Sequence, residues 1–198
     1  MLLYACSTNT GKLKEFELAA TDLTIEPLPI LRTVPPPVEN GTTFEENARI
    51  KAIYYSAFTQ QLVFADDSGL EVDALGGAPG AISARYAGPH ATDEANNALL
   101  LRNLESIAQR SGRFVCVIAL ARQGKVLQTF HGAVEGEILR APRGTNGFGY
   151  DPLFYYPPFA CSFAELAPEQ KFAVSHRGIA LRNLLNFLSQ ENLRPHFD

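Results

Sequence analysis

The apolar positions along the chain fall into short continuous runs and into helix-like repeats. Residues 2–6 and 62–65 are short apolar runs, which predict buried strands. Residues 12–20 place Leu13, Phe16 and Ala20 at spacings of three and four, which predicts a helix with one apolar face. Between them, residues 33–41 contain three successive prolines and predict a loop. Strand-like and helix-like segments therefore alternate from the start of the chain.

Two further helices carry start signals. Thr43 and Glu46 fit a capping box, which predicts a helix that extends to about residue 58. Thr92 precedes two acidic residues and predicts the cap of a helix that extends to about residue 109. The apolar positions of the first of these helices, which we expect to face inward, are Phe44, Ala48, Ala52 and Tyr55.

The second half of the chain predicts a hairpin, a loop and a last helix. Residues 113–122 and 125–135 are joined at Gln123-Gly124 and predict two antiparallel strands. Residues 144–151 form a glycine-rich loop, and Ser175 or a neighbour opens a helix whose apolar side is Ile179, Leu181, Leu184, Leu185 and Leu188. These elements predict an α/β or α+β protein with a mixed sheet, folded as one domain over residues 1–198.

The composition is that of an ordinary globular protein. The chain has 198 residues, of which 46% are hydrophobic and 19% charged, and its formal net charge is −4. This mild acidity disfavours a protein that wraps duplex nucleic acid, because such proteins carry a basic surplus. It leaves room for a small anionic ligand, since a local cluster of Lys and Arg can hold phosphates on an acidic protein. We therefore expect no nucleic-acid partner.

The cysteines and the N-terminus predict a cytoplasmic protein that is not bound to a membrane. Cys6, Cys116 and Cys161 are odd in number and widely spaced, and the first two lie in apolar runs, which is typical of buried thiols in a reducing compartment. No Cys/His spacing typical of a zinc site occurs. The N-terminus lacks the basic start of a signal peptide, and the longest apolar run, residues 114–121, is too short to span a bilayer.

The first candidate site is the turn at residues 7–12, which joins the first strand to the first helix. Such a turn presents free backbone N–H groups and the positive end of the helix dipole, and Lys12 adds a full charge. The turn therefore predicts a phosphate cradle. It is not a Walker loop, because the glycine four positions before Thr10 is missing and Leu13 replaces the metal-binding hydroxyl. The alternative is a polar helix cap with a solvated lysine.

The second candidate site is the acidic pair that follows the run at residues 62–65. Open α/β sheets bind ligands beyond the carboxyl ends of their strands, which is where the sequence pattern places Asp66, Asp67, Ser68 and Gly69. Neighbouring residues of an extended segment point to opposite faces, so the two aspartates should differ in role. One would reach the cleft as a magnesium ligand or a base, and the other would brace the turn. The alternative is an acidic pair that caps a turn.

The third and fourth candidates lie in the last third of the chain. In residues 144–151, glycines allow close approach of the backbone to a ligand, and Phe148 or Tyr150 offers a stacking face worth about 1–3 kcal/mol per base. The alternative is a plain hairpin loop with aromatic plugs. Lys171 and residues 175–178 place cationic or donor groups where the last helix begins, which suits an anion or a carbonyl oxygen. The alternative is a surface helix start with solvated charges, although such charges oppose the helix dipole.

In combination, these motifs resemble the inosine triphosphate pyrophosphatase family, which hydrolyses non-canonical purine nucleoside triphosphates. They occur in the family's order and span most of the chain, at residues 7–12, 43–48 with Lys51, 65–70, 76–80 with 83–86, 147–152 and 175–178. The resemblance implies an elongated mixed sheet between two lobes, a nucleotide in the cleft between them, and a homodimer.

The resemblance also implies a role for each matching residue. The triphosphate would be held by Lys51 and by the turn Ser7, Thr8, Asn9, Thr10, Gly11 and Lys12. Asp67 would bind Mg²⁺ and accept a proton from the attacking water, with Ser68 beside it on the substrate. Phe148 would stack on the purine, with Gly149, Tyr150 and Asp151 completing that wall, and the base edge would face Lys171, His176 and Arg177.

Two departures from the family pattern affect these roles. Family members often carry two acidic residues before the segment at residues 41–44, whereas this chain has Val38, Glu39 and Asn40, so a second acidic metal ligand would have to be Glu39. Ser7 and Thr8 replace the common Thr-Gly, which the loop tolerates if Thr8 avoids a positive φ.

The sequence thus predicts a Mg²⁺-dependent pyrophosphatase that converts ITP, dITP or XTP to the monophosphate and pyrophosphate, and so cleanses the nucleotide pool. One alternative is a nucleotide-binding sensor without catalysis, which the retention of Asp67, Lys12 and Lys51 disfavours. Another is a purely structural partner protein, which would leave the ordered polar motifs unexplained.

Overall fold

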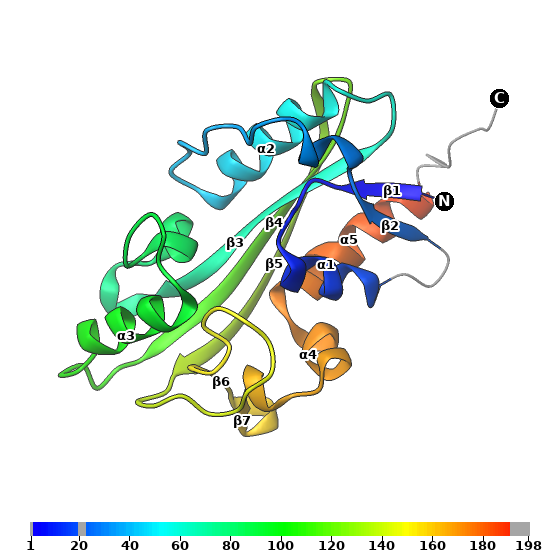
Figure 1. Cartoon of the computed structure of the whole chain (residues 1–198). Coiled ribbons are helices and arrows are strands. Elements are labelled where there is room, and N and C mark those ends of the chain that lie inside the picture. The colour runs from blue at the N-terminus through cyan, green and yellow to red at the C-terminus, as the bar shows by residue number, and fades with distance from the viewer. Residues whose placement is uncertain (1, 20–22, 191–198) are drawn as a thin grey trace.

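The computed structural model describes residues 2–19 and 23–190, and its centre is a seven-stranded mixed sheet (Figure 1). The strands lie in the order β2-β1-β3-β4-β5-β6-β7. β1 (Leu2–Ala5) runs parallel to both of its neighbours, β2 (Thr24–Pro27) and β3 (Val63–Val72). All later pairs are antiparallel, through β4 (Ser111–Arg122), β5 (Lys125–Ile138), β6 (Phe154–Tyr156) and β7 (Cys161–Ser162). The predicted mixed sheet is confirmed.

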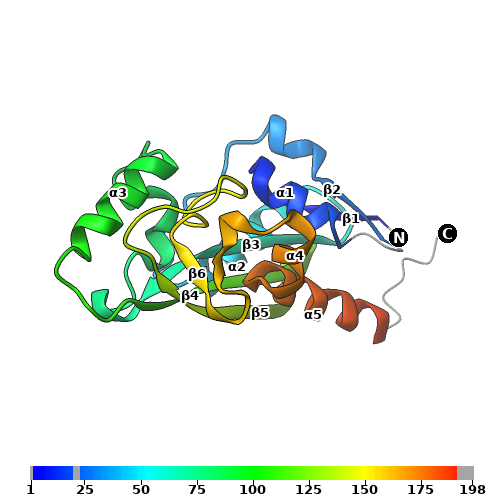
Figure 2. The same cartoon turned by 90° about the horizontal axis from the view of Figure 1, so that it is seen from below.

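Helices cover both faces of this sheet. They are α1 (Thr10–Glu17), α2 (Phe44–Ser56), α3 (Asp93–Asn103), α4 (Pro168–Val174) and α5 (His176–Gln190). α2 packs on one face of β3 and β4, and α5 packs on the other face of β4 and β5 with α1 beside it. Figures 1 and 2 place α3 at the end of the sheet that lies away from the N-terminus. Of the helices in the described ranges, none is long and apolar enough to cross a membrane.

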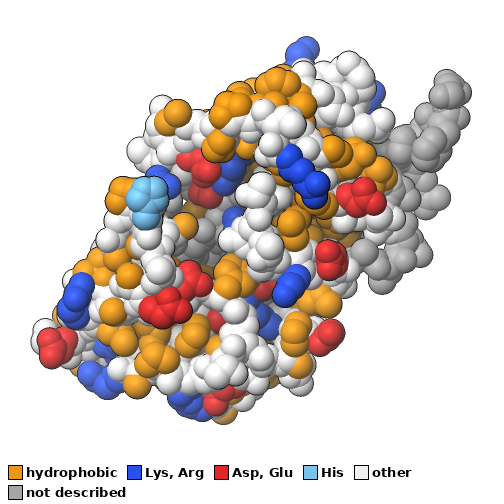
Figure 3. All heavy atoms as spheres, in the orientation of Figure 1, with side chains coloured by type: hydrophobic (Ala, Val, Ile, Leu, Met, Phe, Trp, Pro, Cys, Tyr) orange, Lys and Arg blue, Asp and Glu red, His pale blue; other side chains and the backbone are white. Residues whose placement is uncertain are grey.

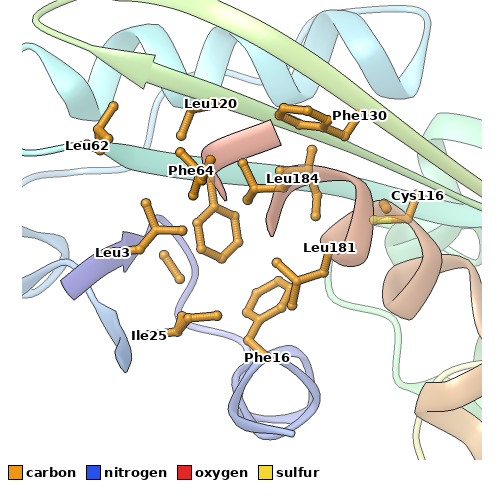
Figure 4. Close-up of a cluster of buried hydrophobic side chains, with 14 of the residues drawn as sticks. Leu3, Phe16, Ile25, Leu62, Phe64, Cys116, Leu120, Phe130, Leu181 and Leu184 are labelled. Atoms are coloured by element: carbon orange, nitrogen blue, oxygen red, sulfur yellow. The ribbon is translucent and has the colours of Figure 1, made fainter. Parts of the chain in front are cut away.

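Alternation along β3 sends successive side chains into two separate apolar layers. Phe64 lies in the layer under α1 and α5 with Phe16 and Leu181, as Figure 4 shows. Its neighbours Val63 and Ala65 lie in the layer under α2. Phe64 is fully buried, and burial of such a side chain stabilises the fold by about 1.5–3 kcal/mol. Both faces of this strand are therefore covered, which explains why its sequence begins as a continuous apolar run.

Several local predictions are confirmed. Thr43 Oγ1 accepts from the Glu46 N–H at 3.1 Å, and the Glu46 side chain reaches back to the Thr43 N–H, so the capping box opens α2. Gln123 and Gly124 both have positive φ, 51° and 76°, as a tight two-residue hairpin turn requires. Ser175 Oγ accepts from the Gly178 N–H at 3.1 Å and so begins α5.

Other boundaries differ from the prediction. β2, β6, β7 and α4 were not predicted. β2 is a four-residue edge strand that ends in Pro27, β6 and β7 have three and two residues, and α4 is too short to show a helical period. The helix predicted at residues 12–20 is α1, which ends at Glu17, and residue 20 lies outside the described residues. α3 ends at Asn103 instead of near residue 109, since the Arg110 guanidinium binds the Leu104 carbonyl at 2.6 Å in the turn that follows.

Candidate functional site

A cavity of about 340 Å³ opens at the point where β1 stops pairing with β3. β1 pairs with Val63 and Phe64, and the chain then leaves the sheet as the turn that leads into α1. Figure 3 shows acidic and basic side chains side by side at the hollow in the middle of this face. Of the residues that the sequence predicted for the site, those lining this cavity are Ser7, Thr8, Asn9, Lys12, Glu39, Lys51, Asp67, Ser68, Phe148, Gly149, Tyr150, Asp151, Lys171, His176 and Arg177. The structure thus gathers segments from the whole length of the chain.

The acidic pair lies within β3, not after it. Residues 66–69 pair with residues 115–118 of β4 in antiparallel register, and β3 continues to Val72. The predicted turn at these residues is therefore wrong. Charged residues normally mark the end of a buried strand, but here each carboxylate meets a cation, which offsets the cost of burying it. Asp66 is 3% exposed and Asp67 is 9% exposed.

The two aspartates contact different cations on opposite faces of β3, as the strand alternation predicted. Asp66 Oδ2 accepts from Lys12 Nζ at 2.8 Å on the α1 side and lies 3.6 Å from Arg177 Nε. Asp67 Oδ1 accepts from Lys51 Nζ of α2 at 2.9 Å. Both side chains still reach one cavity, because β1 no longer covers the edge of β3 at this point.

The proton affinities of Asp66 and Asp67 differ because different cations surround the two carboxyls. Burial raises the pKa of both carboxyls, but the attraction of Lys12, Arg177 and Lys51 outweighs it at Asp66 and lowers that pKa to about 2. At Asp67 the effect of burial exceeds the attraction of Lys51 and Lys12, so the pKa of Asp67 is raised. Asp66 is a fixed anion, whereas Asp67 is the better proton acceptor of the two.

The turn at residues 7–12 caps α1, and its Lys12 is paired with Asp66, whereas the alternative interpretation had it solvated. Asn9 is the N-cap of α1, and its side chain accepts from the Lys12 N–H at 3.0 Å. Ser7 Oγ accepts from the Asn9 N–H at 3.2 Å. Thr8 is not among the described non-glycine residues with positive φ, so this position does not require the glycine common in the family. Thr10 and Gly11 do not line the first cavity; they line a second one beside it.

Phe148 stands between the two cavities and lines both. The second cavity has a volume of about 650 Å³. A Cβ atom on Gly11 would lie 2.6 Å from the Phe148 ring, so this glycine lets the ring approach α1. The ring centroid lies 4.8 Å from Lys171 Nζ and 5.6 Å from Arg177 Cζ, within range of a cation–π interaction. An aromatic face therefore lies next to the cationic end of the site.

Glu15, which lies outside every sequence motif named above, holds these two cations in place. Its carboxylate accepts from Arg177 and lies 2.6 Å from Lys171 Nζ. Lys171 also donates to Asp151 Oδ2 at 2.5 Å. Burial alone would raise the pKa of Glu15, but Arg177 and Lys171 lower it, so the group is charged. Its spacing from Lys12, one helical turn, is the signal by which the sequence places it on the same face of α1.

The start of α5 presents two unpaired polar atoms to the site. Within the described residues, His176 Nδ1 and Arg177 Nε are buried and lack a hydrogen-bond partner. The His176 ring stacks on Phe114 with a centroid distance of 4.8 Å and an interplanar angle of 13°. Burial, with the nearby positive charges, lowers the pKa of His176 well below 6.5, so its ring is neutral. Unpaired buried polar atoms are costly, and a ligand that satisfies them gains that energy.

The comparison with known proteins decides the family. The model of the Ham1 family matches residues 3–187. The chain belongs to the Ham1 family. A dITP/XTP pyrophosphatase of Acidobacterium capsulatum is 50% identical over 196 residues, covering 93% of this chain and 97% of the relative. Another, of Acinetobacter baumannii, is 47% identical over 189 residues and covers 91% of each chain.

Solved Ham1 structures share the fold described above. The Ham1 protein of Staphylococcus aureus has a TM-score of 0.86 and 41% identity, with 96% of this chain and 100% of that chain covered. A HAM1 protein from Coxiella burnetii has a TM-score of 0.85 and 42% identity, covering 96% and 99%. The resemblance inferred from the ordered motifs is therefore confirmed at the level of family and fold.

Within this Ham1 site, two carboxylates share one lysine and form the best candidate metal position. Lys51 Nζ donates to Glu39 Oε2 at 3.0 Å and to Asp67 Oδ1 at 2.9 Å, which brings the predicted pair together. Over residues 2–19 and 23–190 there is no group of three or more acidic, His or Cys side chains that would form a closed metal site. Mg²⁺ needs only one or two carboxylates when substrate phosphates supply further oxygens. Glu39 and Asp67 are therefore sufficient protein ligands for Mg²⁺ bound together with a triphosphate.

Proposed function

We propose that this protein hydrolyses ITP, dITP and XTP to the nucleoside monophosphate and pyrophosphate, in a reaction that requires Mg²⁺. The observation that carries the proposal is the meeting of a carboxylate of raised pKa, two lysines and an aromatic ring in one cavity. The names of the relatives, dITP/XTP pyrophosphatases of about half identical sequence, support the same substrate class.

Asp67 is the proton acceptor in this mechanism. Water attacks the α-phosphorus, its proton passes to the Asp67 carboxylate, and the bond to the leaving pyrophosphate breaks. The raised pKa of Asp67 suits this role, because a base works best when its pKa approaches the working pH. Asn47 Nδ2 lies 3.4 Å from Asp67 Oδ2 and Lys51 lies on Oδ1, so both oxygens are held in a fixed orientation.

The phosphates lie between the Ser7–Lys12 turn and Lys51. The two lysine charges bind the β- and γ-phosphates and stabilise the charge that develops on the leaving group, together with those N–H groups of the turn that Ser7 Oγ and Asn9 Oδ1 do not already bind. Asp67 and Glu39 would hold Mg²⁺, which supplies Lewis-acid polarisation of phosphate oxygens when bound. Binding of triphosphate requires Lys12 and Lys51 to exchange part of their carboxylate contacts for phosphate oxygens.

The base lies against Phe148, with its edge toward the start of α5. Hypoxanthine and xanthine carry a carbonyl oxygen where adenine carries an amine. Among the described residues, His176 Nδ1 and Arg177 Nε are buried on this side without a hydrogen-bond partner. Arg177 Nε can only donate, so it suits a carbonyl oxygen and not an amine, and His176 does the same when its ring proton is on Nδ1. Gly149, Tyr150 and Asp151 complete the wall, and Lys171 lies beside the ring.

A pyrophosphate-release screen tests this proposal. Purified protein is given each natural and each deaminated nucleoside triphosphate, with Mg²⁺ and with EDTA in parallel. We expect ITP, dITP and XTP to be hydrolysed far faster than ATP and GTP, and all rates to fall in EDTA. Release of orthophosphate instead of pyrophosphate, or equal rates for ATP and ITP, would contradict the proposal.

Two further expectations belong to the same proposal. The homodimer implied by the family resemblance is tested by sedimentation velocity across a range of protein concentrations. The cytoplasmic location is supported by Cys6, Cys116 and Cys161, which are free thiols. Cell fractionation with an antibody against the protein tests the location.

A further inference from the structure

Helix α3 binds both backbone polar groups of Gly149, which lies in the glycine-rich loop at residues 144–151. The Gly149 N–H donates to Asp93 Oδ2 at 2.6 Å, and Asn97 Nδ2 donates to the Gly149 carbonyl oxygen at 2.9 Å. Asp93 and Asn97 are four residues apart, so they lie on one face of α3, one turn apart. The donor and the acceptor of Gly149 are thus fixed by a single rigid element.

Gly149 is a position where the backbone needs such support. Its φ is +63°, in the left-handed region, and no atom lies within 4 Å of the place where a Cβ would be. The glycine is therefore required for the shape of the backbone and not for space. Phe148 precedes it directly, so the orientation of the Gly149 peptide sets the direction from which the Phe148 ring enters the site.

The remaining attachments of the loop lie on either side of this one. The Phe148 N–H donates to Asp151 Oδ2 at 2.8 Å, and Lys171 binds the same oxygen. The Tyr150 hydroxyl donates to the Ser83 carbonyl oxygen at 2.8 Å. Among the described residues, only the contacts from α3 act on Gly149 itself. Asp93 also lines both cavities that Phe148 separates.

We propose that Asp93 and Asn97 are positioning residues for base selection, which act by fixing the Gly149 peptide and with it the Phe148 ring. This inference rests on the proposed function, in which the purine stacks on Phe148. The reacting phosphate lies at Asp67, on another part of the cavity wall. Loss of the contacts from α3 therefore changes how well the base is held and discriminated, and leaves the chemical step largely intact.

If Asp93 only stabilised helix α3, other acidic residues in the first turn would have the same effect on activity. An acidic residue in the first turn of a helix stabilises the helix through its dipole, and Glu94 does the same from the next position. Glu94 has no contact with the loop in the described structure, since its partners are Thr92 and its own backbone. Glu94→Gln is therefore the matched control for Asp93. Asn103→Ala is the control for Asn97, because Asn103 lies on the same helix and binds Tyr86 instead of Gly149.

The first experiment measures kcat and KM for ITP and GTP. We expect Asn97→Ala and Asp93→Ala each to raise KM for ITP by about three- to tenfold, the effect of losing one ordinary hydrogen bond. The ITP/GTP ratio of kcat/KM should fall, and kcat for ITP should stay near that of the parent. Asp93→Asn keeps an acceptor oxygen and should restore most of the loss. Both control variants should match the parent.

The second experiment observes the ring position directly. The sequence contains no tryptophan, so Phe148→Trp introduces a single fluorescent reporter. Adding Asn97→Ala to this variant should increase quenching of the indole by acrylamide and lower its anisotropy, while adding Asn103→Ala should not. Asn97→Leu has a similar volume without the donor, and it replaces Asn97→Ala if the alanine variant does not fold.

Unchanged selectivity together with unchanged quenching in the Asp93 and Asn97 variants would overturn this inference. A parent protein that does not hydrolyse ITP would overturn the proposed function instead. In that case the quenching experiment still shows whether α3 fixes the Phe148 ring.

Discussion

Glu15 and Arg177 form a buried ion pair although 162 residues separate them in the sequence. Glu15 lies on the first helix and Arg177 at the start of the last, and both are less than 10% exposed. Lys171 binds the other oxygen of the same carboxylate at 2.6 Å. One acidic side chain therefore neutralises two cations of the base-binding end of the site.

Removal of this charge should destabilise the whole fold. In Glu15→Gln, Arg177 and Lys171 lose a buried counter-charge, and breaking one side of a buried pair costs about 3–5 kcal/mol. Urea unfolding measures this loss as a lower midpoint with an unchanged m-value. Glu17→Gln is the control, because Glu17 is an exposed acid on the same helix. Equal midpoints for Glu15→Gln and the parent would show that the pair adds nothing to stability.

The same pair shows how far sequence reasoning reaches. The Thr43 capping box and the Gln123-Gly124 turn were predictable, because the groups that stabilise each lie within a few residues. The contact between Glu15 and Arg177 leaves no local signal, since it depends on how α1 and α5 pack in three dimensions. Motifs in the order of a known family named most of the residues that line the cavity, but not Glu15, the carboxylate that binds both Arg177 and Lys171.

The prediction that the acidic pair ends a strand was wrong for a related physical reason. The sequence pattern places Asp66 and Asp67 at the end of a strand, because an unpaired charge is costly to bury in the middle of a sheet. Lys12, Lys51 and Arg177 make them tolerable, and all three arrive from other elements. Long-range charge compensation is thus the information that the local pattern lacks.

The proposed base gives a second prediction. Asp67→Asn should keep the fold but lower kcat by about 10²–10⁴, as expected when a base that also binds metal is removed. The parent should also lose kcat at low pH, because the pKa of Asp67 is raised and its protonated form cannot accept a proton. A pH–rate profile of both proteins measures this. Asp73→Asn, an exposed aspartate just beyond β3, should behave as the parent. Turnover of ITP by Asp67→Asn near the parent rate would show that the base lies elsewhere.

A third prediction concerns the phosphates. Lys12→Ala and Lys51→Ala should each weaken binding of ITP far more than binding of IMP, because their charges act on the β- and γ-phosphates. Affinity of the parent for ITP should fall as salt increases. Isothermal titration with both nucleotides measures the difference, and Lys125→Ala, at the exposed first residue of β5, is the control. Equal losses for IMP and ITP would move the two lysines away from the distal phosphates.

A fourth prediction concerns stability against pH. His176 has a lowered pKa in the folded state, so the unfolded chain, with an ordinary pKa near 6.5, binds the proton more tightly. The stability of the parent should therefore be complete above pH 6.5 and decrease below it, by up to about 1.4 kcal/mol per pH unit from this one group. His176→Phe keeps an aromatic ring on Phe114 without a titrating group, and this decrease should disappear.

The comparison between variants isolates this effect. Asp67 and Asp151 have raised pKa values, so their contributions have the opposite sign and are lost as pH rises. They are present in both the parent and His176→Phe and cancel in the difference. Urea unfolding at pH 5 and pH 7 gives the measurement, and His90→Gln, at an exposed histidine, should keep the slope of the parent. A slope that His176→Phe does not change would show that the buried ring is not what senses pH.

The last prediction concerns selection of the base. Deamination replaces the exocyclic amine of adenine, a donor, with a carbonyl acceptor at the same ring position. Arg177 Nε, and His176 Nδ1 when it carries the ring proton, are donors without a hydrogen-bond partner in the described structure, and an adenine amine would leave them unsatisfied. Each such loss costs about 1–3 kcal/mol, so the loss of both disfavours ATP by about 30-fold to 10⁴-fold. GTP shares the carbonyl oxygen, and its rejection must therefore rest on its 2-amino group, near residues 148–151.

Arg177→Ala should cut hydrolysis of ITP and XTP much more than the residual hydrolysis of ATP, so that the ITP/ATP ratio of kcat/KM shrinks. Because Arg177 also binds Glu15 and Ser68, the assay must be run below the melting temperature of the variant. Arg182→Ala, an exposed arginine on the same helix, should keep both the ratio and the stability of the parent. If the ratio stays constant while all activities fall together, Arg177 holds phosphate or the fold. In that case His176 would be the remaining unpaired group at the base edge, and His176→Phe should then shrink the ratio.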